Sequence, residues 1–181
     1  MMSLFSLRKE AHWSFSSLNT YLNICSLRYA FEYVYGLERE KVSASLPFGR
    51  AFHAALSEYA ISTMSGKTME LSEVQEAFCE YLSIELNDTE NICFKEGESP
   101  ELLRERGMLM LAVALENWKH DERVTDIAKA LSAQVPQASK VLIGEMDMLV
   151  RSQDGKPVIV DWKSSASKWP HEKADKDLQA T

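Results

Sequence analysis

The stretch from Val141 to Lys163, VLIGEMDMLVRSQDGKPVIVDWK, decides the fold that this sequence predicts. Hydrophobic residues alternate with polar or acidic ones from Leu142 to Val150, and with charged ones from Val158 to Lys163. A period of two is typical of a β-strand with one buried face. The turn signal Asp154-Gly155 separates the two halves, so the stretch predicts a β-hairpin.

The position of Gly155 selects the register of this hairpin. A three-residue loop over 153–155, with glycine in the left-handed conformation as a bulge, makes the hydrophobic faces of the two strands coincide. A two-residue Asp-Gly loop would shift the pairing by one and set hydrophobic residues against charged ones. We therefore expect the three-residue loop. The predicted pairs are Met146 with Trp162, Met148 with Val160, Asp147 with Asp161, and Glu145 with Lys163.

This register gathers two carboxylates and a lysine on one face of the hairpin. Like charges that lie close together disfavour joint ionisation unless a cation sits between them. Carboxylate oxygens are hard ligands that suit Mg²⁺ or Mn²⁺. The alternative is a solvated outer face that carries a cross-strand ion pair between Glu145 and Lys163.

Five segments carry a resemblance to a known family. The hairpin, with GEMD ending at Asp147 and IVDWKS from Ile159, resembles motifs two and three of the RecB-type PD-(D/E)xK nucleases. Gly49 to His53 (GRAFH) resembles their G-x-x-x-H helix. Asp177-Leu178-Gln179 is similar to the start of their Q-x-x-x-Y motif, and 16–29 resembles their opening helix, S-x-L-x-x-Y-x-x-C-P, with Ser26 in the place of proline. The resemblance spans Ser14 to Gln179. Since Thr181 precedes the last motif's tyrosine, we expect the C-terminal part of the domain to be missing.

The resemblance implies an α/β fold with a restriction-endonuclease-like core. We expect one domain over residues 1–181, in which a mainly helical part (1–120) packs on a small mixed sheet centred on the hairpin (121–181, including the start of the following helix). The resemblance also implies a metal-dependent DNA nuclease, chiefly an exonuclease, acting in DNA processing, recombination or repair. A helicase or recombination protein is the candidate partner, and DNA the substrate.

The same resemblance assigns roles to individual residues. His53, Asp147, Asp161 and the backbone carbonyl of Trp162 would hold Mg²⁺ or Mn²⁺. Lys163 would orient or deprotonate the attacking water and contact the scissile phosphate. Gln179 would position the lysine or the DNA backbone. Two alternatives stay open: His53 as a structural histidine beside a hydrophobic helix stripe, and the whole chain as a non-catalytic DNA-end-binding or partner-interaction module.

The composition limits the classes of protein to which this chain can belong. The 181 residues are 45% hydrophobic and 26% charged, which is typical of one soluble globular domain. No hydrophobic run approaches the roughly 20 residues of a membrane span, so no membrane partner is expected, and 1–10 lacks a secretory signal. Three cysteines without C-x-x-C spacing suit a reducing cytoplasm. The net charge of −7 disfavours DNA binding outside a local basic groove.

Cys25 allows two interpretations. In iron–sulfur relatives of this superfamily, a cysteine at this place is the first of four cluster ligands. The stripe of Leu18, Tyr21, Leu22, Cys25 and Tyr29 instead predicts a small buried core residue. Since Cys25 is the one candidate ligand in this sequence, we expect the core residue and no iron–sulfur cluster. Core packing is also expected for the aromatic residues of 29–35, rather than a base-stacking surface.

The remaining sequence predicts helices around the hairpin. We expect Ser16 or Ser17 to cap the first helix, and further helices over Pro47–Thr63 and Ser72–Leu86. Ser99-Pro100 starts another that runs to about Lys119. The polar segment 87–99 predicts a loop. Local propensity favours helix over Val124–Val135, whereas the family favours a strand near Leu131–Val135, and we choose the strand. The end of the chain, 171–181, predicts a helix, and Trp169 is either a core residue or a stacking surface.

Overall fold

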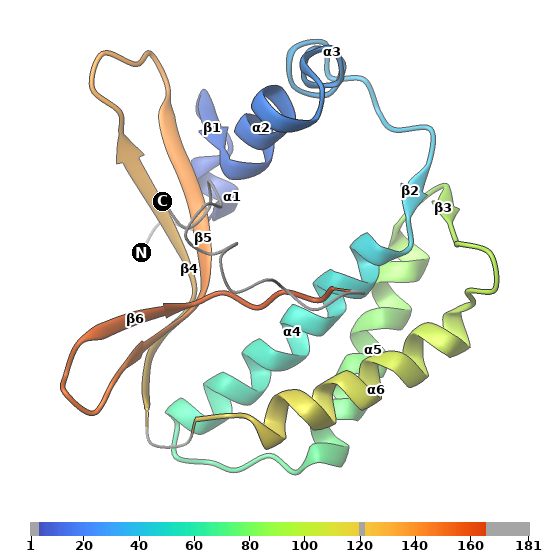
Figure 1. The fold of residues 1–181 in the computed structure, drawn as a ribbon, viewed down its shortest axis with the longest axis vertical. Coiled ribbons are helices and arrows are strands. Elements are labelled where there is room, and N and C mark those ends of the chain that lie inside the picture. The colour runs from blue at the N-terminus through green and yellow to red at the C-terminus, as the bar shows by residue number, and fades with distance from the viewer. Residues whose placement is uncertain (1–3, 120–121, 166–181) are drawn as a thin grey trace. The chain divides into compact units, whose positions relative to one another are not determined.

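The computed structural model describes residues 4–119 and 122–165. The chain has the predicted α/β fold, with helices and a small mixed sheet (Figure 1). It forms two compact units. Unit 1 comprises Met1–Arg39, Lys129–Met146 and Ser165–Thr181, and unit 2 comprises Glu40–Ala128 and Asp147–Ser164. Strands β4 (Arg123–Gln134) and β5 (Val141–Arg151) each run from one unit into the other. The single domain over 1–181 stays a prediction.

The main sheet has the strand order β1-β5-β4, and β6 also pairs with β5. Strand β1 (His12–Ser14) runs parallel to the beginning of β5, whereas β6 (Pro157–Val160) is antiparallel to its end. Strand β4 confirms the choice of strand over helix and begins earlier than the predicted Leu131. Tertiary pairing with β5 therefore overrides the local helix propensity of this segment.

The hairpin of β5 and β6 confirms the predicted register. Met148 pairs with Val160, and Gly155 has a φ of 81°. The Gly155 N–H donates to the Ser152 carbonyl oxygen at 2.8 Å, and the Ser152 N–H donates to that of Lys156 at 3.0 Å, so the loop has three residues. Asp154 accepts from the Ser152 hydroxyl at 2.6 Å. The ladder ends at the pair of Met148 and Val160. Asp147 and Asp161 are the next residues beyond this pair, one on each side of the hairpin.

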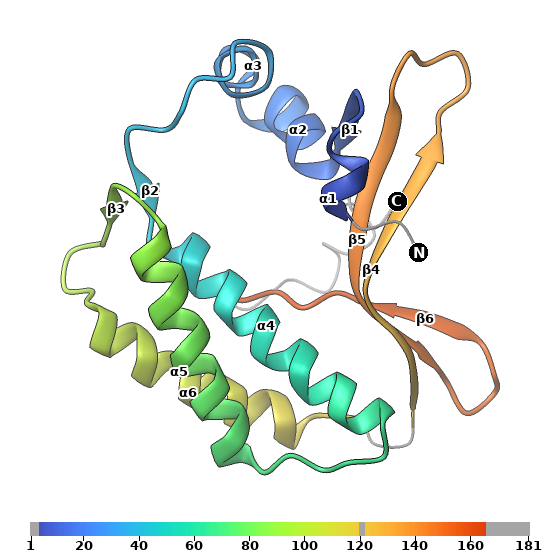
Figure 2. The same ribbon diagram turned by 180° about the vertical axis from the view of Figure 1, so that it is seen from behind.

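Three helices form the bulk of unit 2 and lie side by side in both views (Figures 1 and 2). They are α4 (Ser45–Met64), α5 (Leu71–Asp88) and α6 (Pro100–Glu116). All three were predicted, and α6 has the expected cap, since the Ser99 hydroxyl accepts from the Leu102 N–H at 3.3 Å. Helix α4 begins two residues before Pro47, and α6 ends three residues before Lys119.

Phenylalanine packing holds these helices together. The fully buried Phe78 of α5 lies edge-on to Phe48 and Phe52 of α4, with ring centroids 5.7 and 6.3 Å apart. On α6, Gly107 faces the same ring: a Cβ at this position would lie 2.1 Å from Phe78. Only glycine therefore permits this approach between α5 and α6.

The segment predicted as a loop over 87–99 contains a short strand. Residues Ile92–Cys93 (β3) pair in parallel with Val42–Ser43 (β2) as a separate two-stranded sheet. The Ala44 N–H donates to the Cys93 carbonyl oxygen at 3.1 Å. A ladder of two residues leaves no periodicity in the sequence, so the loop prediction was wrong at this point.

Unit 1 begins with α1 (Leu4–Leu7) and then has a chain of short helical segments. These are α2 (Phe15–Asn19), η1 (Thr20–Ile24), α3 (Ser26–Tyr29) and η2 (Ala30–Val34), of which η1 and η2 are π-helical. The N-cap is Ser14, not Ser16 or Ser17. The Ser14 hydroxyl accepts from the Ser17 N–H, and the Ser17 hydroxyl accepts from the Ser14 N–H, as in a capping box.

The predicted hydrophobic stripe of this region is wrong. Cys25 is exposed, and so are Phe31, Tyr33 and Tyr35 of the aromatic run. The stripe assumed 3.6 residues per turn, but π-helical turns contain more residues, and Cys25 itself interrupts the helix in an extended conformation (φ −167°, ψ 118°). Within the described residues, no helix combines the length and the hydrophobicity that crossing a membrane requires.

Candidate functional site

Helix α4 brings His53 against the hairpin within unit 2. Small residues make the close approach possible. A Cβ on Gly49 would lie 3.6 Å from the Ser164 hydroxyl oxygen, and Ala60 is fully buried in a cluster with Met148 and Val150 of β5. The G-x-x-x-H spacing on α4 thus orients its glycine and histidine toward residues that follow or belong to the hairpin.

His53 and Asp147 meet although 94 positions separate them. The distance between His53 Nδ1 and Asp147 Oδ1 is 3.1 Å. An ionised carboxylate can only accept, so the hydrogen lies on Nδ1 and the lone pair of the neutral ring lies on Nε2. The Asp147 side chain is 18% exposed and that of His53 34% exposed. The pair is therefore partly sheltered from solvent.

The second oxygen of Asp147 contacts the segment that follows β6. The backbone N–H of Trp162 donates to Asp147 Oδ2 at 2.7 Å. The Trp162 ring lies edge-on to His53, with centroids 5.9 Å apart, and 6.3 Å from the ring of Trp118. One carboxylate thus links α4, β5 and the IVDWKS segment.

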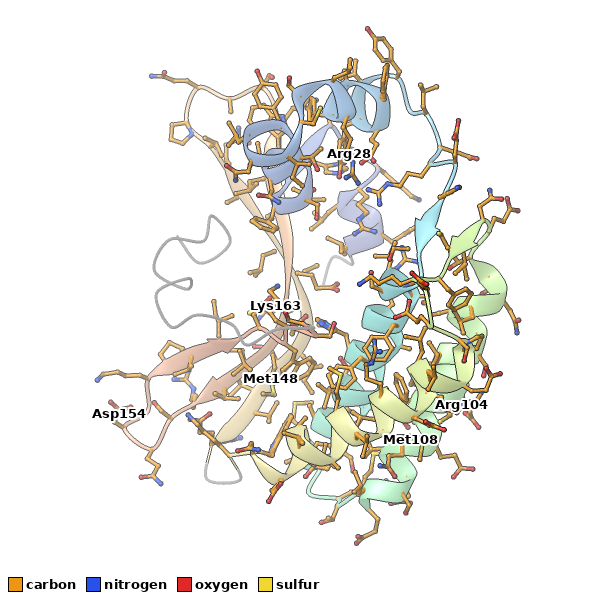
Figure 3. The ribbon with its side chains drawn as sticks, turned by 45° about the vertical axis from the view of Figure 1, so that its right-hand side comes forward. Arg28, Arg104, Met108, Met148, Asp154 and Lys163 are labelled. Carbon is orange, nitrogen blue, oxygen red and sulfur yellow. The ribbon has the colours of Figure 1, made fainter. Side chains whose placement is uncertain are left out.

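Asp161 and Lys163 form the other half of the site. The Lys163 ammonium donates to Asp161 Oδ2 at 2.7 Å, and both side chains are 34% exposed. Figure 3 shows Lys163 where the chain leaves the hairpin, with Asp154 at the opposite tip. The lysine therefore lies beside a carboxylate of the same motif.

The donor types fit a hard divalent cation, since an imidazole nitrogen and carboxylate oxygens bind Mg²⁺ and Mn²⁺. As a metal site, however, the arrangement of these side chains is incomplete. Over residues 4–119 and 122–165, no three His, Cys, Asp or Glu side chains gather as a metal cluster. His53 contacts Asp147, whereas Asp161 contacts Lys163. Gln179 and Trp169 lie outside the described residues.

Sequence reasoning missed two contacts of this site. It assigned Trp162 a role through its carbonyl oxygen alone, whereas the N–H binds Asp147 and the ring packs on His53. It also gave no role to Ser164, which faces Gly49. The hairpin register could have predicted the first contact, because it places Trp162 one residue beyond the partner of Asp147.

A comparison with protein-family models matches residues 12–181 to a family described as the PD-(D/E)XK nuclease superfamily. A search of curated proteins and a search of solved structures gave no match. The matched range includes all five segments of the sequence resemblance and the four residues His53, Asp147, Asp161 and Lys163.

Proposed function

Because the chain belongs to the PD-(D/E)XK nuclease superfamily, we propose that it is a metal-dependent DNA nuclease of the RecB type, acting as an exonuclease in DNA processing. The observation that carries the proposal is the contact between His53 of the G-x-x-x-H helix and Asp147 of the hairpin. Two motifs that are distant in the sequence and recognisable separately thus meet in space.

Each residue has a role in this mechanism. His53, Asp147 and Asp161, with the carbonyl oxygen of Trp162, would hold Mg²⁺ or Mn²⁺. A cation held there would supply Lewis-acid chemistry, because it would lower the pKa of water and offset negative charge. Lys163 would orient or deprotonate the attacking water and contact the scissile phosphate. The Trp162 N–H holds the Asp147 carboxylate in a fixed orientation.

Cleavage of end-labelled linear DNA tests the proposal. The wild-type chain should cleave with Mn²⁺ or Mg²⁺, and chelation with EDTA should abolish cleavage. Lys163→Met and Asp161→Asn should each lose at least about 100-fold in rate, as expected when a group that acts on the transition state is removed. Lys156→Met and Asp154→Asn are matched controls, since this pair lies at the hairpin tip. Equal cleavage by Lys163→Met and the wild type would exclude the mechanism.

One observation favours a second candidate, a non-catalytic DNA-end-binding or partner-interaction module. Among the described residues the three proposed side-chain ligands do not form one cluster. For such a module, DNA binding would survive in EDTA and no metal would produce cleavage. The cleavage assay therefore separates the two candidates.

A further inference from the structure

Unit 1 contains a pocket that the proposed catalytic residues do not use. Its volume is about 230 Å³. Its lining comes from the segment around β1, from the helical segments α2 to η2, and from Lys140, the residue before β5. All of the lining residues belong to unit 1.

Tyrosines form one wall of this pocket. The rings of Tyr29 and Tyr33 are stacked, with centroids 5.3 Å apart and an interplanar angle of 27°. Tyr21 supports Tyr29 from the side, edge-on at 5.3 Å. Tyr33 is 42% exposed. Two π-helical segments flank Tyr29, and π-turns occur frequently at functional sites. A partly exposed aromatic ring offers a flat face to another planar group.

The other lining residues offer polar groups. Lys140 forms no ion pair with the part of the chain that the structure describes, so its charge is available to a ligand. His12 Nδ1 donates to the Glu10 carbonyl oxygen at 2.7 Å, which leaves Nε2 for another partner. The hydroxyls of Ser14 and Ser17 are already used by the capping box. The Glu10 side chain is the one carboxylate in the lining.

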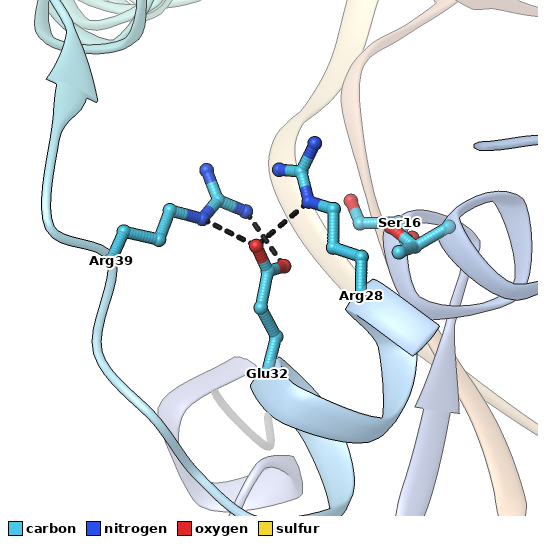
Figure 4. A network of polar contacts seen from close by, with 5 residues as sticks. Ser16, Arg28, Glu32 and Arg39 are labelled. Carbon is cyan, nitrogen blue, oxygen red and sulfur yellow. Dashed lines mark hydrogen bonds and ion pairs between the residues drawn. The ribbon is translucent and has the colours of Figure 1, made fainter. Parts of the chain in front are cut away.

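Two arginines lie near these tyrosines in the sequence, Arg28 on α3 and Arg39 in the loop after η2. Glu32 holds both of them: Arg28 Nε donates to Oε1 at 2.8 Å, and Arg39 donates through Nε and Nη2 at 2.8 and 2.9 Å (Figure 4). The two guanidinium groups therefore share one negative charge. Their side chains are 43% and 44% exposed. Arg28 directly precedes Tyr29 in the sequence, and Glu32 directly precedes Tyr33. The charged pair is therefore adjacent in the sequence to the stacked tyrosines.

The acidic character of the chain is confined to the other unit. Segments 1–39 and 129–146 of unit 1 hold six lysines and arginines and four aspartates and glutamates, whereas unit 2 holds eleven and twenty. The net charge of −7 thus conceals a small basic excess in these two segments of unit 1. A polyanion would be attracted to unit 1 and repelled by unit 2.

We propose that this pocket binds an unpaired nucleobase of single-stranded DNA, which stacks on Tyr33 while Lys140 and the Arg28–Arg39 pair contact the adjoining phosphates. Sequence-independent binding of single strands combines these two elements, aromatic faces for bases and basic groups for the backbone. A paired base has no free face to offer such a pocket. The inference rests on the proposed function, since it specifies the form of DNA that the nuclease takes.

Binding in EDTA tests the pocket without any cleavage. The probe is a single-stranded oligonucleotide of about ten nucleotides with 2-aminopurine, whose fluorescence is quenched when the base stacks. Tyr33→Leu should bind roughly ten-fold more weakly and lose the quenching. Tyr33→Trp should retain both. Tyr35→Leu is the matched control, because Tyr35 directly follows η2, is 68% exposed and does not line the pocket. It should bind within about two-fold of the wild type.

The salt dependence gives a second measurement. Lys140→Met should reduce the slope of log K against log salt concentration by about 0.7, the value for one phosphate contact on a single strand. Lys156→Met, at the hairpin tip of unit 2, should leave the slope unchanged. A duplex of the same sequence should bind more weakly than the single strand and show no quenching.

The outcomes separate this inference from the nuclease proposal. If Tyr33→Leu binds and quenches like the wild type, or if the wild type binds no single-stranded DNA, the pocket is not a nucleobase site, whatever the cleavage assay gives. If no metal produces cleavage while Tyr33 and Lys140 still govern binding, the nuclease proposal fails and the pocket stands.

Discussion

Asp147 is the residue on which the candidate site depends. It accepts hydrogen bonds with both oxygens, one from His53 and one from the Trp162 backbone, so three segments of unit 2 meet at one carboxylate. A hydrogen bond to a charged group is worth about 1.5–3 kcal/mol. The same carboxylate is therefore both a structural link and a metal-ligand candidate, and a test must distinguish these two roles.

His53→Ala makes that distinction through metal affinity. We expect Mn²⁺ binding, measured by calorimetry, to weaken by at least about ten-fold, because a direct ligand should matter at least as much as the partners that orient ligands. His12→Ala removes a histidine from unit 1 and should leave Mn²⁺ affinity unchanged. If His53→Ala binds Mn²⁺ as tightly as the wild type, His53 is a structural partner of Asp147.

Glu32 gives a prediction in pH. The hydrogen bond from Arg39, aided by Arg28, lowers the pKa of Glu32 below its ordinary value of 4.5. A lowered folded-state pKa stabilises the fold above about pH 4.5, and this contribution is lost as the pH falls through the folded-state pKa. Glu32→Gln should thus lower the free energy of unfolding at neutral pH by about 1 kcal/mol, and by less at a pH well below 4.5. An equal loss at both pH values in denaturant melts would refute the ion-pair explanation.

At the scale of elements, the α5–α6 contact depends on a missing side chain. Gly107→Ala should destabilise unit 2 by about 1–3 kcal/mol in urea unfolding, although alanine favours a helix. The reason is that the Phe78 ring is fully buried and has no room to move away from the new methyl group. Val113→Ala, at a 59% exposed position on the same helix, should change stability by less than about 0.5 kcal/mol. A stabilised Gly107→Ala would contradict this packing.

Strand β4 contains an unusual residue where it passes between the units. Ala128 has a φ of 47°, in the left-handed region that β-branched residues avoid. Ala128→Val should therefore destabilise the fold by more than about 1 kcal/mol. Ala130→Val, two positions further along the same strand, has no such conflict, and valine favours strands. Thermal melts in which Ala130→Val is the more damaging of the two would show that β4 has a different backbone path.

At the scale of the whole molecule, the sequence predicted what periodicity and turn chemistry determine. The hairpin register followed from one glycine, α4 from its hydrophobic stripe, and α6 from its Ser99-Pro100 start. The structure describes four of the five segments that resemble the family, and the family model matches residues 12–181. These features depend on local residue patterns, which a single sequence displays.

The parts that the sequence could not predict depend on deviations from regular periodicity. Two π-helical segments and the break at Cys25 shifted the register of the first helix, so residues assigned to a core are exposed. The left-handed Ala128 and the two-residue β3 have no sequence signal either. In the candidate site, Asp161 contacts Lys163, and the Trp162 N–H donates to Asp147. Both contacts depend on side-chain conformations, which the alternation of a strand does not determine.

The position of Trp162 has an optical consequence. Its indole lies 6.3 Å from that of Trp118 at an interplanar angle of 38°, close enough for their electronic transitions to couple. Such a pair should give a paired positive and negative band in far-ultraviolet circular dichroism, and Trp118→Phe should remove it. Because the backbone N–H of Trp162 donates to Asp147 and its ring lies edge-on to His53, a cation bound at that pair should change the surroundings of the indole. The chain thus carries an intrinsic, label-free reporter of its own candidate metal site.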